Sequence, residues 1–478
     1  MRIFMAIILI LFLPLYAFSE DEGKKLYDDW CAQCHGYKGD GKGYSTDFTF
    51  PKPRGFVKGI YKFHSTPSGS PPTDNDIIRS IRKGNPGSSM PPWKRFSDNE
   101  VKALVNYLKR FSPENFESPA EPIKIGKAPR VTDELIQKGK RLFEEAKCWE
   151  CHGKSGRGDG EKGWQEKFKD EWGDRIYPAN LTYPWELGNG SDMEDLYRRT
   201  ITAGIEGTPM ASYQDDLKDD ERWALAHFIK SLQLKRKLGI ALRMVKVDSA
   251  PSSTNDPIWG ETDYLDLPIG GQILFNPRHF TPTITNVRVR GVYTDSEIAI
   301  MLEWVDKKPN KGDDGMPSDA AHMQFPSKIP EGAEKPYFYM GDRRRAVTLW
   351  QWKASEDSAR EYIAKGPEVV TEQERQDVKA TSTYTDGLYR VIFKRPLNTG
   401  DREDMGFEVG RFIPFSVTLY DGWNKEEGNK GVISAWYYLM LEPPMHIKVY
   451  LLPPIVSLAV YGLGLVLRRK LGKKYKIK

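Results

Sequence analysis

Cysteine is scarce in this sequence, because the chain of 478 residues contains only four. All four lie in two pentapeptides with the pattern C-x-x-C-H, Cys31-Ala32-Gln33-Cys34-His35 and Cys148-Trp149-Glu150-Cys151-His152. Because the two motifs use every thiol, none is left for a disulfide bond or for a cysteine-rich zinc site elsewhere. The chemistry of the chain is therefore expected to centre on these motifs.

The chain also lacks an excess of positive charge outside its two ends. The net charge is +5, but Arg2 and the seven basic residues after Leu467 contribute eight positive charges. Subtracting these eight charges leaves −3 for the rest of the chain. A mildly acidic body argues against nucleic acid as a partner, since that partner requires a basic face.

The C-x-x-C-H pattern is the signature of covalent haem attachment. Two thiols three positions apart can each form a thioether to one porphyrin, and the adjacent imidazole then lies under the iron as its proximal ligand. The alternatives are a redox-active dithiol and half of a zinc site. Two copies behind an export signal favour two haem c groups. The residues predicted to hold them are Cys31, Cys34, His35, Cys148, Cys151 and His152.

Residues 1–19 predict a secretory signal. Arg2 precedes an apolar run from Ile3 to Leu13, and Ala17-Phe18-Ser19 provides a small-x-small cleavage site. The alternative is a retained N-terminal anchor. With a cleaved signal or a retained anchor, the bulk of the chain is exported. Haem attachment to C-x-x-C-H takes place on that side of a bacterial membrane, so the two signals agree.

Residues 20–115 predict a first helical domain around the first motif. A glycine-rich segment, 36–43, follows the motif and can pass close to a haem edge without side-chain clashes. Met90 lies in a rigid loop that contains several prolines. The capping box Ser97-x-x-Glu100 then predicts an amphipathic helix over 101–111.

The same layout recurs after a proline-rich linker over 116–130, which predicts a second domain over 131–240. Gly139 to Phe143 repeats Gly23 to Tyr27, and a closing helix is predicted over 219–232. The motif histidines lie 117 positions apart, and Met90 and its counterpart Met210 lie 120 positions apart. The agreement of these offsets indicates a duplicated domain.

Both segments resemble class I cytochromes c in their order of N-terminal helix, C-x-x-C-H, methionine loop and C-terminal helix. The resemblance implies two all-α domains, with His35 and Met90 as axial ligands of one iron and His152 and Met210 as those of the other. A thioether sixth ligand raises the reduction potential and closes the iron to small molecules, which suits electron transfer. The less favoured ligands in the two domains are His64 and His227.

Residues 245–442 change from helical to alternating periodicity. Short runs rich in Val, Ile, Tyr, Trp and Phe are separated by Gly, Pro, Asn and Asp. The predicted strands are 287–294, 298–306, 346–354, 388–397, 411–420 and 433–442. Such a series predicts a mainly β sandwich, which from composition alone would be a secreted binding module.

Five segments of this region carry a second resemblance. They are Leu302-Glu303-Trp304, Asp319 to Pro326, Met340-Gly341-Asp342, Leu349 to Ala354 and Gly428 to Tyr437. Together they resemble the haem b-binding γ subunits of ethylbenzene dehydrogenase, dimethylsulfide dehydrogenase, selenate reductase, chlorate reductase and nitrite oxidoreductase. In that family a Met and a Lys hold a non-covalent haem b, so the resemblance implies Met340 and Lys430. The alternatives that stay open are Met323, Lys425, His279 and His322.

Residues 449–467 form a run of 19 residues without a charge, close to the roughly 20 that cross a bilayer as a helix. The tail 468–478 is basic and is expected to remain cytoplasmic. These features predict a chain anchored on the periplasmic side of the bacterial inner membrane, with a buried C-terminal helix as the alternative. The soluble γ subunits lack this anchor and the cytochrome c domains, which leaves the identity of the partner open.

The sequence thus predicts a multidomain chain with two all-α cytochrome c domains, a β-sandwich haem b domain and one transmembrane helix. The predicted function is electron transfer without catalysis, between the molybdenum and iron–sulfur subunits of a dimethyl sulfoxide reductase-family enzyme and a cytochrome or quinone-linked carrier. One competing function is a haem enzyme with an open iron site. The other is a cytochrome c fused to a cofactor-free binding sandwich.

Overall fold

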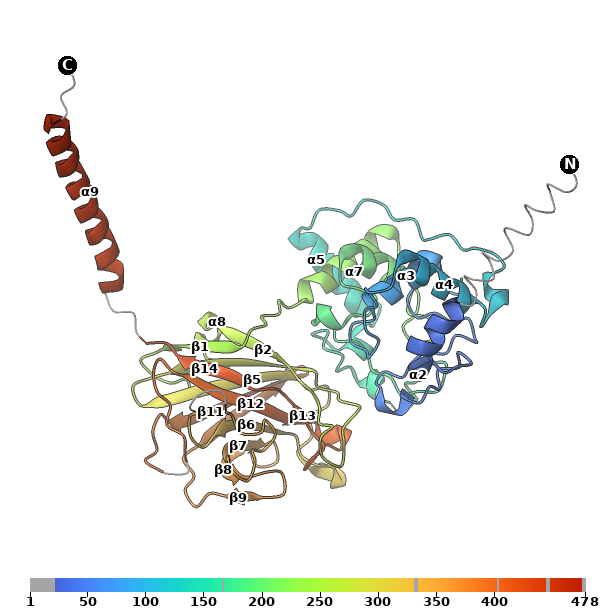
Figure 1. The fold of residues 1–478 in the computed structure, drawn as a ribbon. Coiled ribbons are helices and arrows are strands. Elements are labelled where there is room, and N and C mark those ends of the chain that lie inside the picture. The colour runs from blue at the N-terminus through green and yellow to red at the C-terminus, as the bar shows by residue number, and fades with distance from the viewer. Residues whose placement is uncertain (1–21, 166, 331–333, 402–403, 444–447, 475–478) are drawn as a thin grey trace, which may run out of the picture.

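A helical region and a sheet region lie side by side, and a single long helix projects from the sheet region (Figure 1). The structure, a computed structural model, describes residues 22–165, 167–330, 334–401, 404–443 and 448–474. The predicted signal over 1–19 lies outside these residues. The chain is thus multidomain, as expected.

The first helical module, residues 22–116, surrounds the first motif. Residues 22–30 are helical. The further elements are α2 Ala32–His35, η1 Thr46–Phe48, α3 Asp74–Lys83, α4 Asp98–Lys109 and η2 Pro113–Phe116. The capping box predicted at Ser97 is present, because the Glu100 amide donates to Ser97 Oγ (3.3 Å) and Glu100 Oε2 accepts from the Ser97 amide (2.6 Å). The helix therefore begins at Asp98, three residues before the predicted start.

The second helical module, residues 131–233, repeats this plan around the second motif. Its elements are α5 Asp133–Glu145, α6 Trp149–His152, η3 Glu161–Trp164, η4 Pro184–Glu186, a π-helix η5 Asp195–Thr202 and α7 Asp219–Leu232. The range of α7 is the predicted one. The linker before this module contains no helix or strand over 117–132, and the Ile123 amide ties it to the Ser65 carbonyl (2.7 Å).

In each module the first and last helices cross at a glycine. A Cβ added at Gly23 would lie 2.3 Å from the carbonyl oxygen of Ala103 in α4. A Cβ added at Gly139 would lie 2.1 Å from the carbonyl oxygen of Ala224 in α7. Both distances are far below contact, so only glycine permits the approach. The repeat seen in the sequence is therefore a repeat of packing as well.

Residues 241–441 form a large mixed sheet. Its strands are β1 Ala241–Lys246, β2 Tyr264–Pro268, β3 Gly270–Gly271, β4 Asn286–Tyr293, β5 Glu297–Val305, β6 Ala320–Pro326, β7 Val347–Lys353, β8 Ser358–Ala364, β9 Val370–Glu372, β10 Lys379–Thr385, β11 Leu388–Pro396, β12 Phe412–Tyr420, β13 Val432–Ile433 and β14 Tyr437–Leu441. The main order is β10-β11-β5-β4-β1-β14-β12-β6-β7-β8-β9. Strand β1 runs parallel to both of its neighbours, β14 and β4, which makes the sheet mixed.

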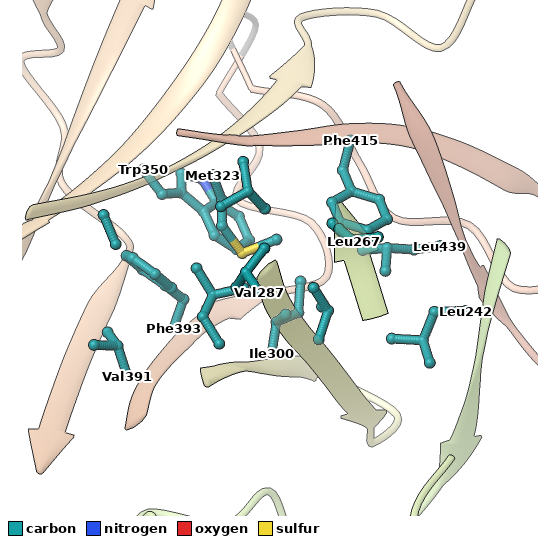
Figure 2. Packing of buried hydrophobic residues seen from close by; sticks show 14 of the residues in the cluster. Leu242, Leu267, Val287, Ile300, Met323, Trp350, Val391, Phe393, Phe415 and Leu439 are labelled. Carbon is teal, nitrogen blue, oxygen red and sulfur yellow. The ribbon is translucent and has the colours of Figure 1, made fainter. Parts of the chain in front are cut away.

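The core of this sheet joins strands that are distant in its order. Trp304 of β5 contacts Trp352 of β7 with ring centroids 6.0 Å apart, and Trp350 of β7 lies 6.3 Å from Phe393 of β11. Figure 2 shows Met323 and Trp350 among the aliphatic side chains of this core. The two halves of the sheet therefore face each other across one apolar core, as a sandwich requires.

Two sequence expectations for this region need correction. The strand predicted over 433–442 is broken into β13 and β14, because the Ser434 hydroxyl accepts a hydrogen bond from the Val417 amide (2.9 Å) and interrupts the strand pairing. Strand β6 lies outside the predicted strands. All seven of its residues are buried, so polar and apolar positions do not alternate in the way that identifies a half-buried strand.

The C-terminal helix α9 spans Lys448–Lys474 and includes Pro453 and Pro454. Within it, Leu451–Leu471 is long and apolar enough to cross a membrane, with a mean hydropathy of 1.7. The length and composition of this segment are the grounds for naming it a candidate membrane span. The helix also includes the first seven residues of the predicted basic tail, and residues 475–478 lie outside the described part of the chain.

Candidate haem-binding cavity

Each C-x-x-C-H motif lies in a short helix that directly follows the first helix of its module. In the first module the Cys31 amide donates to the Tyr27 carbonyl (2.8 Å), and in the second the Cys148 amide donates to the Phe143 carbonyl (3.0 Å). All four cysteines are free thiols. Burial raises the pKa of the free Cys31 thiol to about 12 and that of Cys148 to about 11.

Both motif histidines have one ring nitrogen engaged and one available. His35 Nδ1 lies 2.8 Å from the Arg54 carbonyl oxygen, and His152 Nδ1 lies 3.0 Å from the Ala179 carbonyl oxygen. A carbonyl oxygen only accepts, so Nδ1 carries the proton and Nε2 keeps a lone pair for a metal. Burial lowers the pKa of both imidazoles, which favours the neutral, ligating form.

The two methionine loops have the same main-chain pattern. The Asn85 amide donates to the Met90 carbonyl (3.1 Å), and the Ile205 amide donates to the Met210 carbonyl (3.0 Å). A hydroxyl two residues before each methionine, on Ser88 or Thr208, accepts from the methionine amide at 3.3 or 3.2 Å. In the first loop alone, Asn85 Nδ2 also donates to Met90 Sδ (3.3 Å).

A single cavity of about 1290 Å³ contains both predicted sites. The cysteines, histidines and methionines proposed for both modules line it, namely Cys31, Cys34, His35, Met90, Cys148, Cys151, His152 and Met210. The free thiols, the available imidazole nitrogens and the two thioethers match the donor set of two haem c groups. The residues present therefore fit this cofactor at both motifs.

Buried ion pairs lock the two modules together around the cavity. Arg199 of η5 pairs with Asp76 of α3, and side chains of both are less than a tenth exposed. Arg79 Nη2 lies 2.6 Å from Asp195 Oδ2 across the same interface. Removing one partner of such a pair leaves a buried charge uncompensated, so these contacts hold the two halves of the cavity in register.

The sheet region forms part of the cavity wall. Thr283, Thr285 and Lys307 line it from that side. Lys307 Nζ donates to the Pro178 carbonyl (3.3 Å), and Trp423 packs edge-on against Trp164 with centroids 4.6 Å apart. Figure 1 shows the helical region beside the end of the sheet where β13 is labelled. The sheet is thus docked against the candidate site.

Met340 and Lys430, the predicted haem b ligands, lie on two loops of the sheet region that touch each other. Tyr339 Oη donates to Asn429 Oδ1 (3.1 Å) between these loops. Lys430 Nζ donates to the carbonyls of Asn424 (2.7 Å) and Lys425 (3.2 Å), while Met340 is buried in an apolar cluster. A neutral amine that donates to two carbonyls keeps its one lone pair, so Met340 and Lys430 stay a prediction from the resemblance.

The alternative ligands lie in different surroundings, and His279 and His322 each keep one buried ring nitrogen, Nδ1, without a hydrogen-bond partner. Met323 is fully buried in the sheet core, and Lys425 adopts a left-handed turn conformation with φ of 56°. His279 Nε2 lies 2.7 Å from Glu426 Oε1. His322 Nε2 lies 2.7 Å from Gln351 Nε2, and burial lowers its pKa to about 3.

The two less favoured histidines of the helical modules lie outside the cavity lining. His64 Nδ1 contacts the Thr66 carbonyl (3.0 Å), and His227 is buried in α7. The sequence did not single out Arg54 and Ala179, because they orient the histidines through their carbonyls and any side chain could do the same. Asn85 could have been noticed as a polar residue five positions before Met90.

Comparisons with known proteins agree with this geometry in the helical region. Residues 136–233 match the family model described as cytochrome c. Residues 19–108 match the model described as cytochrome c oxidase, cbb3-type, subunit III. The chain therefore carries cytochrome c domains, which bind haem covalently.

Related proteins extend the comparison to larger parts of the chain. A candidate respiratory nitrate reductase haem subunit, ORF7, of Haloferax mediterranei is 23% identical over 48% of this chain and 82% of its own length. The chlorate reductase γ subunit of Ideonella dechloratans is 26% identical over 33% of this chain and 66% of its own length. A solved chain of the Kuenenia stuttgartiensis reducing HAO-like protein complex Kustc0457/Kustc0458 is 42% identical over 45% of this chain and 96% of its own, with a TM-score of 0.43. The chain is thus related to haem subunits of reductase complexes.

Proposed function

We propose that this cytochrome c chain is a membrane-anchored, periplasmic electron-transfer subunit of an oxidoreductase complex, with two haem c groups and no catalytic site of its own. The observation that carries the proposal is the single cavity lined by both C-x-x-C-H motifs and both methionine loops. Two carriers in one protein cavity support transfer between them without any diffusing intermediate.

The residues of the chain would hold, orient and shield the cofactors. Cys31, Cys34 and His35 would hold one haem c with Met90, and the matching residues of the second module would hold the other. When bound, haem supplies reversible uptake and release of one electron. The carbonyls of Arg54 and Ala179 keep each proximal imidazole in the tautomer that ligates. The thioethers of Met90 and Met210 would close the distal positions to small molecules.

The proposed partner is a molybdenum and iron–sulfur enzyme of the dimethyl sulfoxide reductase family, with a cytochrome or quinone-linked carrier at the other end. The relationship to nitrate and chlorate reductase haem subunits supports this partner class. The apolar helix Leu451–Leu471 supports an anchor. A haem b held by Met340 and Lys430 remains a prediction from the resemblance, and it would require Lys430 to be a neutral amine.

Carbon monoxide binding to the purified, reduced, full-length protein tests the proposal. We expect two haem c per chain in a pyridine haemochrome assay, and no carbon monoxide adduct at either. Met90→Ala and Met210→Ala, tested singly, should each create one binding site and so confirm that the thioethers close the irons. Stoichiometric carbon monoxide uptake by the unmodified protein would instead support an enzyme with an open iron. The pyridine haemochrome assay would also measure haem b directly.

A further inference from the structure

Three buried carboxylates meet at one end of the sheet region. Asp306 follows β5, Asp319 precedes β6 and Asp421 follows β12. Their exposed fractions are 1%, 0% and 3%, and each offers an oxygen within 4.8 Å of those of the other two. Charged groups at such depth require compensation, because burying an unpaired carboxylate is costly.

The hydroxyls of Thr283 and Tyr389 supply part of that compensation, but no ion pair between described residues does. None of the ion pairs between residues that the structure describes includes Asp306, Asp319 or Asp421. Asp306 Oδ1 accepts from the Lys308 amide (2.9 Å), but Asp306 Oδ2 is buried and has no hydrogen-bond partner. Burial and the neighbouring carboxylates raise the pKa of Asp306 and Asp319, the latter to about 7. The cluster therefore contains an oxygen that is available to a ligand.

A second acidic cluster in the same sheet shows the contrast. Glu361, Asp377 and Asp404 also lie within reach of one common ligand. Here the guanidinium of Arg395, itself only 3% exposed, lies 3.4 Å from Asp404 and 3.6 Å from Glu361. The protein thus neutralises one cluster with a buried arginine, whereas no described lysine or arginine takes that place among the first three carboxylates.

We propose that Asp306, Asp319 and Asp421 bind a divalent cation of the calcium class. The donors are all oxygens, and three carboxylates with three negative charges suit a hard ion that takes six to eight oxygen ligands. Asp319 Oδ2 accepts from the Asn310 amide (2.5 Å) and Tyr389 Oη (3.1 Å), whereas Oδ1 accepts only from the Gly422 amide (2.8 Å) and so keeps a lone pair for a metal. Mg²⁺ suits the site less, because it requires near-ideal octahedral geometry and retains its water.

This site lies directly behind the wall that the sheet presents to the haem cavity. Thr283, which lines the cavity, donates its hydroxyl to Asp421 Oδ2. Lys307, the next residue after Asp306, lines the cavity as well, and Trp423 packs against the second module. The cation would therefore stabilise the end of the sheet that docks onto the helical region. The proposal does not depend on the haem content or on the function proposed above.

Metal analysis and thermal unfolding of the full-length protein in detergent test this site. After dialysis against buffer with micromolar Ca²⁺, we expect about one Ca²⁺ per chain by mass spectrometry. Adding Ca²⁺ to chelator-treated protein should raise the Tm of the sheet region by roughly 5–10 °C at a 100-fold excess over Kd. Mg²⁺ at the same concentration should produce a smaller rise.

Asp306→Asn keeps the shape of the side chain and removes its charge. It should abolish both the bound Ca²⁺ and the Ca²⁺-dependent rise in Tm. Asp404→Asn, in the cluster that Arg395 neutralises, is the matched control and should retain both. The proposal is overturned if chelator-treated wild-type protein, still folded by circular dichroism, neither binds Ca²⁺ nor shifts its Tm. It is also overturned if folded Asp306→Asn responds to Ca²⁺ as the wild type does.

Discussion

The two helical modules have the same hydrogen bonds in their methionine loops and differ in what contacts the methionine sulfur. In the first module Asn85 Nδ2 donates to Met90 Sδ (3.3 Å), whereas Ile205 occupies the matching position in the second module and has no side-chain donor. A hydrogen bond withdraws electron density from a ligand sulfur and so favours the reduced metal. The two modules therefore share the predicted ligands and differ in what surrounds them.

The modules also differ in their neighbours. The second module makes the hydrogen bonds to the sheet region, including Arg157 Nη1 to the Asp386 carbonyl (2.6 Å) and Lys307 Nζ to the Pro178 carbonyl. The first module touches the sheet through the ring contact of Phe48 with Phe280, whose centroids are 4.9 Å apart. Both modules thus contact the sheet region, the second through hydrogen bonds and the first through an aromatic contact.

Removing the thiols of one motif should have the largest effect on the protein. Cys31→Ser with Cys34→Ser should eliminate one covalent haem, and Cys148→Ser with Cys151→Ser should eliminate the other, because each thiol pair attaches its own porphyrin. The pyridine haemochrome signal should fall to half in either variant. Loss of both haems from one double variant would show instead that the modules mature as a unit.

Arg199→Ala should separate the modules. The change removes the charge partner of buried Asp76, which keeps its hydrogen bonds from Ser65 and Thr73, so the cost should be at most about 3–5 kcal/mol. The expected result is a clearly lower Tm for the helical region in calorimetry. Lys138→Ala is the control, because its partner Asp220 is exposed, and it should leave the Tm nearly unchanged. Equal effects from both variants would contradict the role of the buried pair.

His64 should make the first module sensitive to acid. Burial is the main cause that lowers its pKa, and it lies 3.9 Å from Glu206 of the second module, with Asp76 and Arg199 also nearby. Below the ordinary histidine pKa of about 6.5, the unfolded chain binds a proton that the folded module does not. The free energy of unfolding therefore decreases as the pH is lowered, by at most about 1.4 kcal/mol per pH unit.

His64→Gln removes this titrating group. The decrease in Tm between neutral pH and about pH 5 should therefore be smaller in the variant than in the wild type. Matching pH profiles for the two proteins would show that His64 does not titrate differently on unfolding.

The smallest expected effect concerns the sulfur contact itself. Asn85→Leu should lower the reduction potential of the first haem by something on the order of tens of mV, because the donor to Met90 is lost. Ile205→Asn is the reciprocal change and should raise the potential of the second haem. Spectroelectrochemical titration of both variants measures the two shifts. Shifts of the same sign would disprove the proposed cause.

The sequence predicted best those features that depend on residues close together along the chain. The motif at Cys31 to His35 and the capping box at Ser97 are local patterns, and the structure contains the short helix and the cap. Strand β6 escaped prediction because all seven of its residues are buried, so its polar and apolar positions do not alternate. Lys430 was chosen by resemblance, and its two carbonyl partners depend on the fold of a turn that no pattern in the sequence describes.

Spacing along the chain thus specified the two thiol pairs, the histidine beside each and the methionine loop that follows, because these features depend on residues close together in sequence. The fold alone brought both motifs to one cavity, closed it with Thr283 and Lys307, and placed Asp306, Asp319 and Asp421 within reach of each other. Those arrangements join positions that are tens to hundreds of residues apart. They depend on packing and on compensation of buried charge, which short-range patterns do not encode.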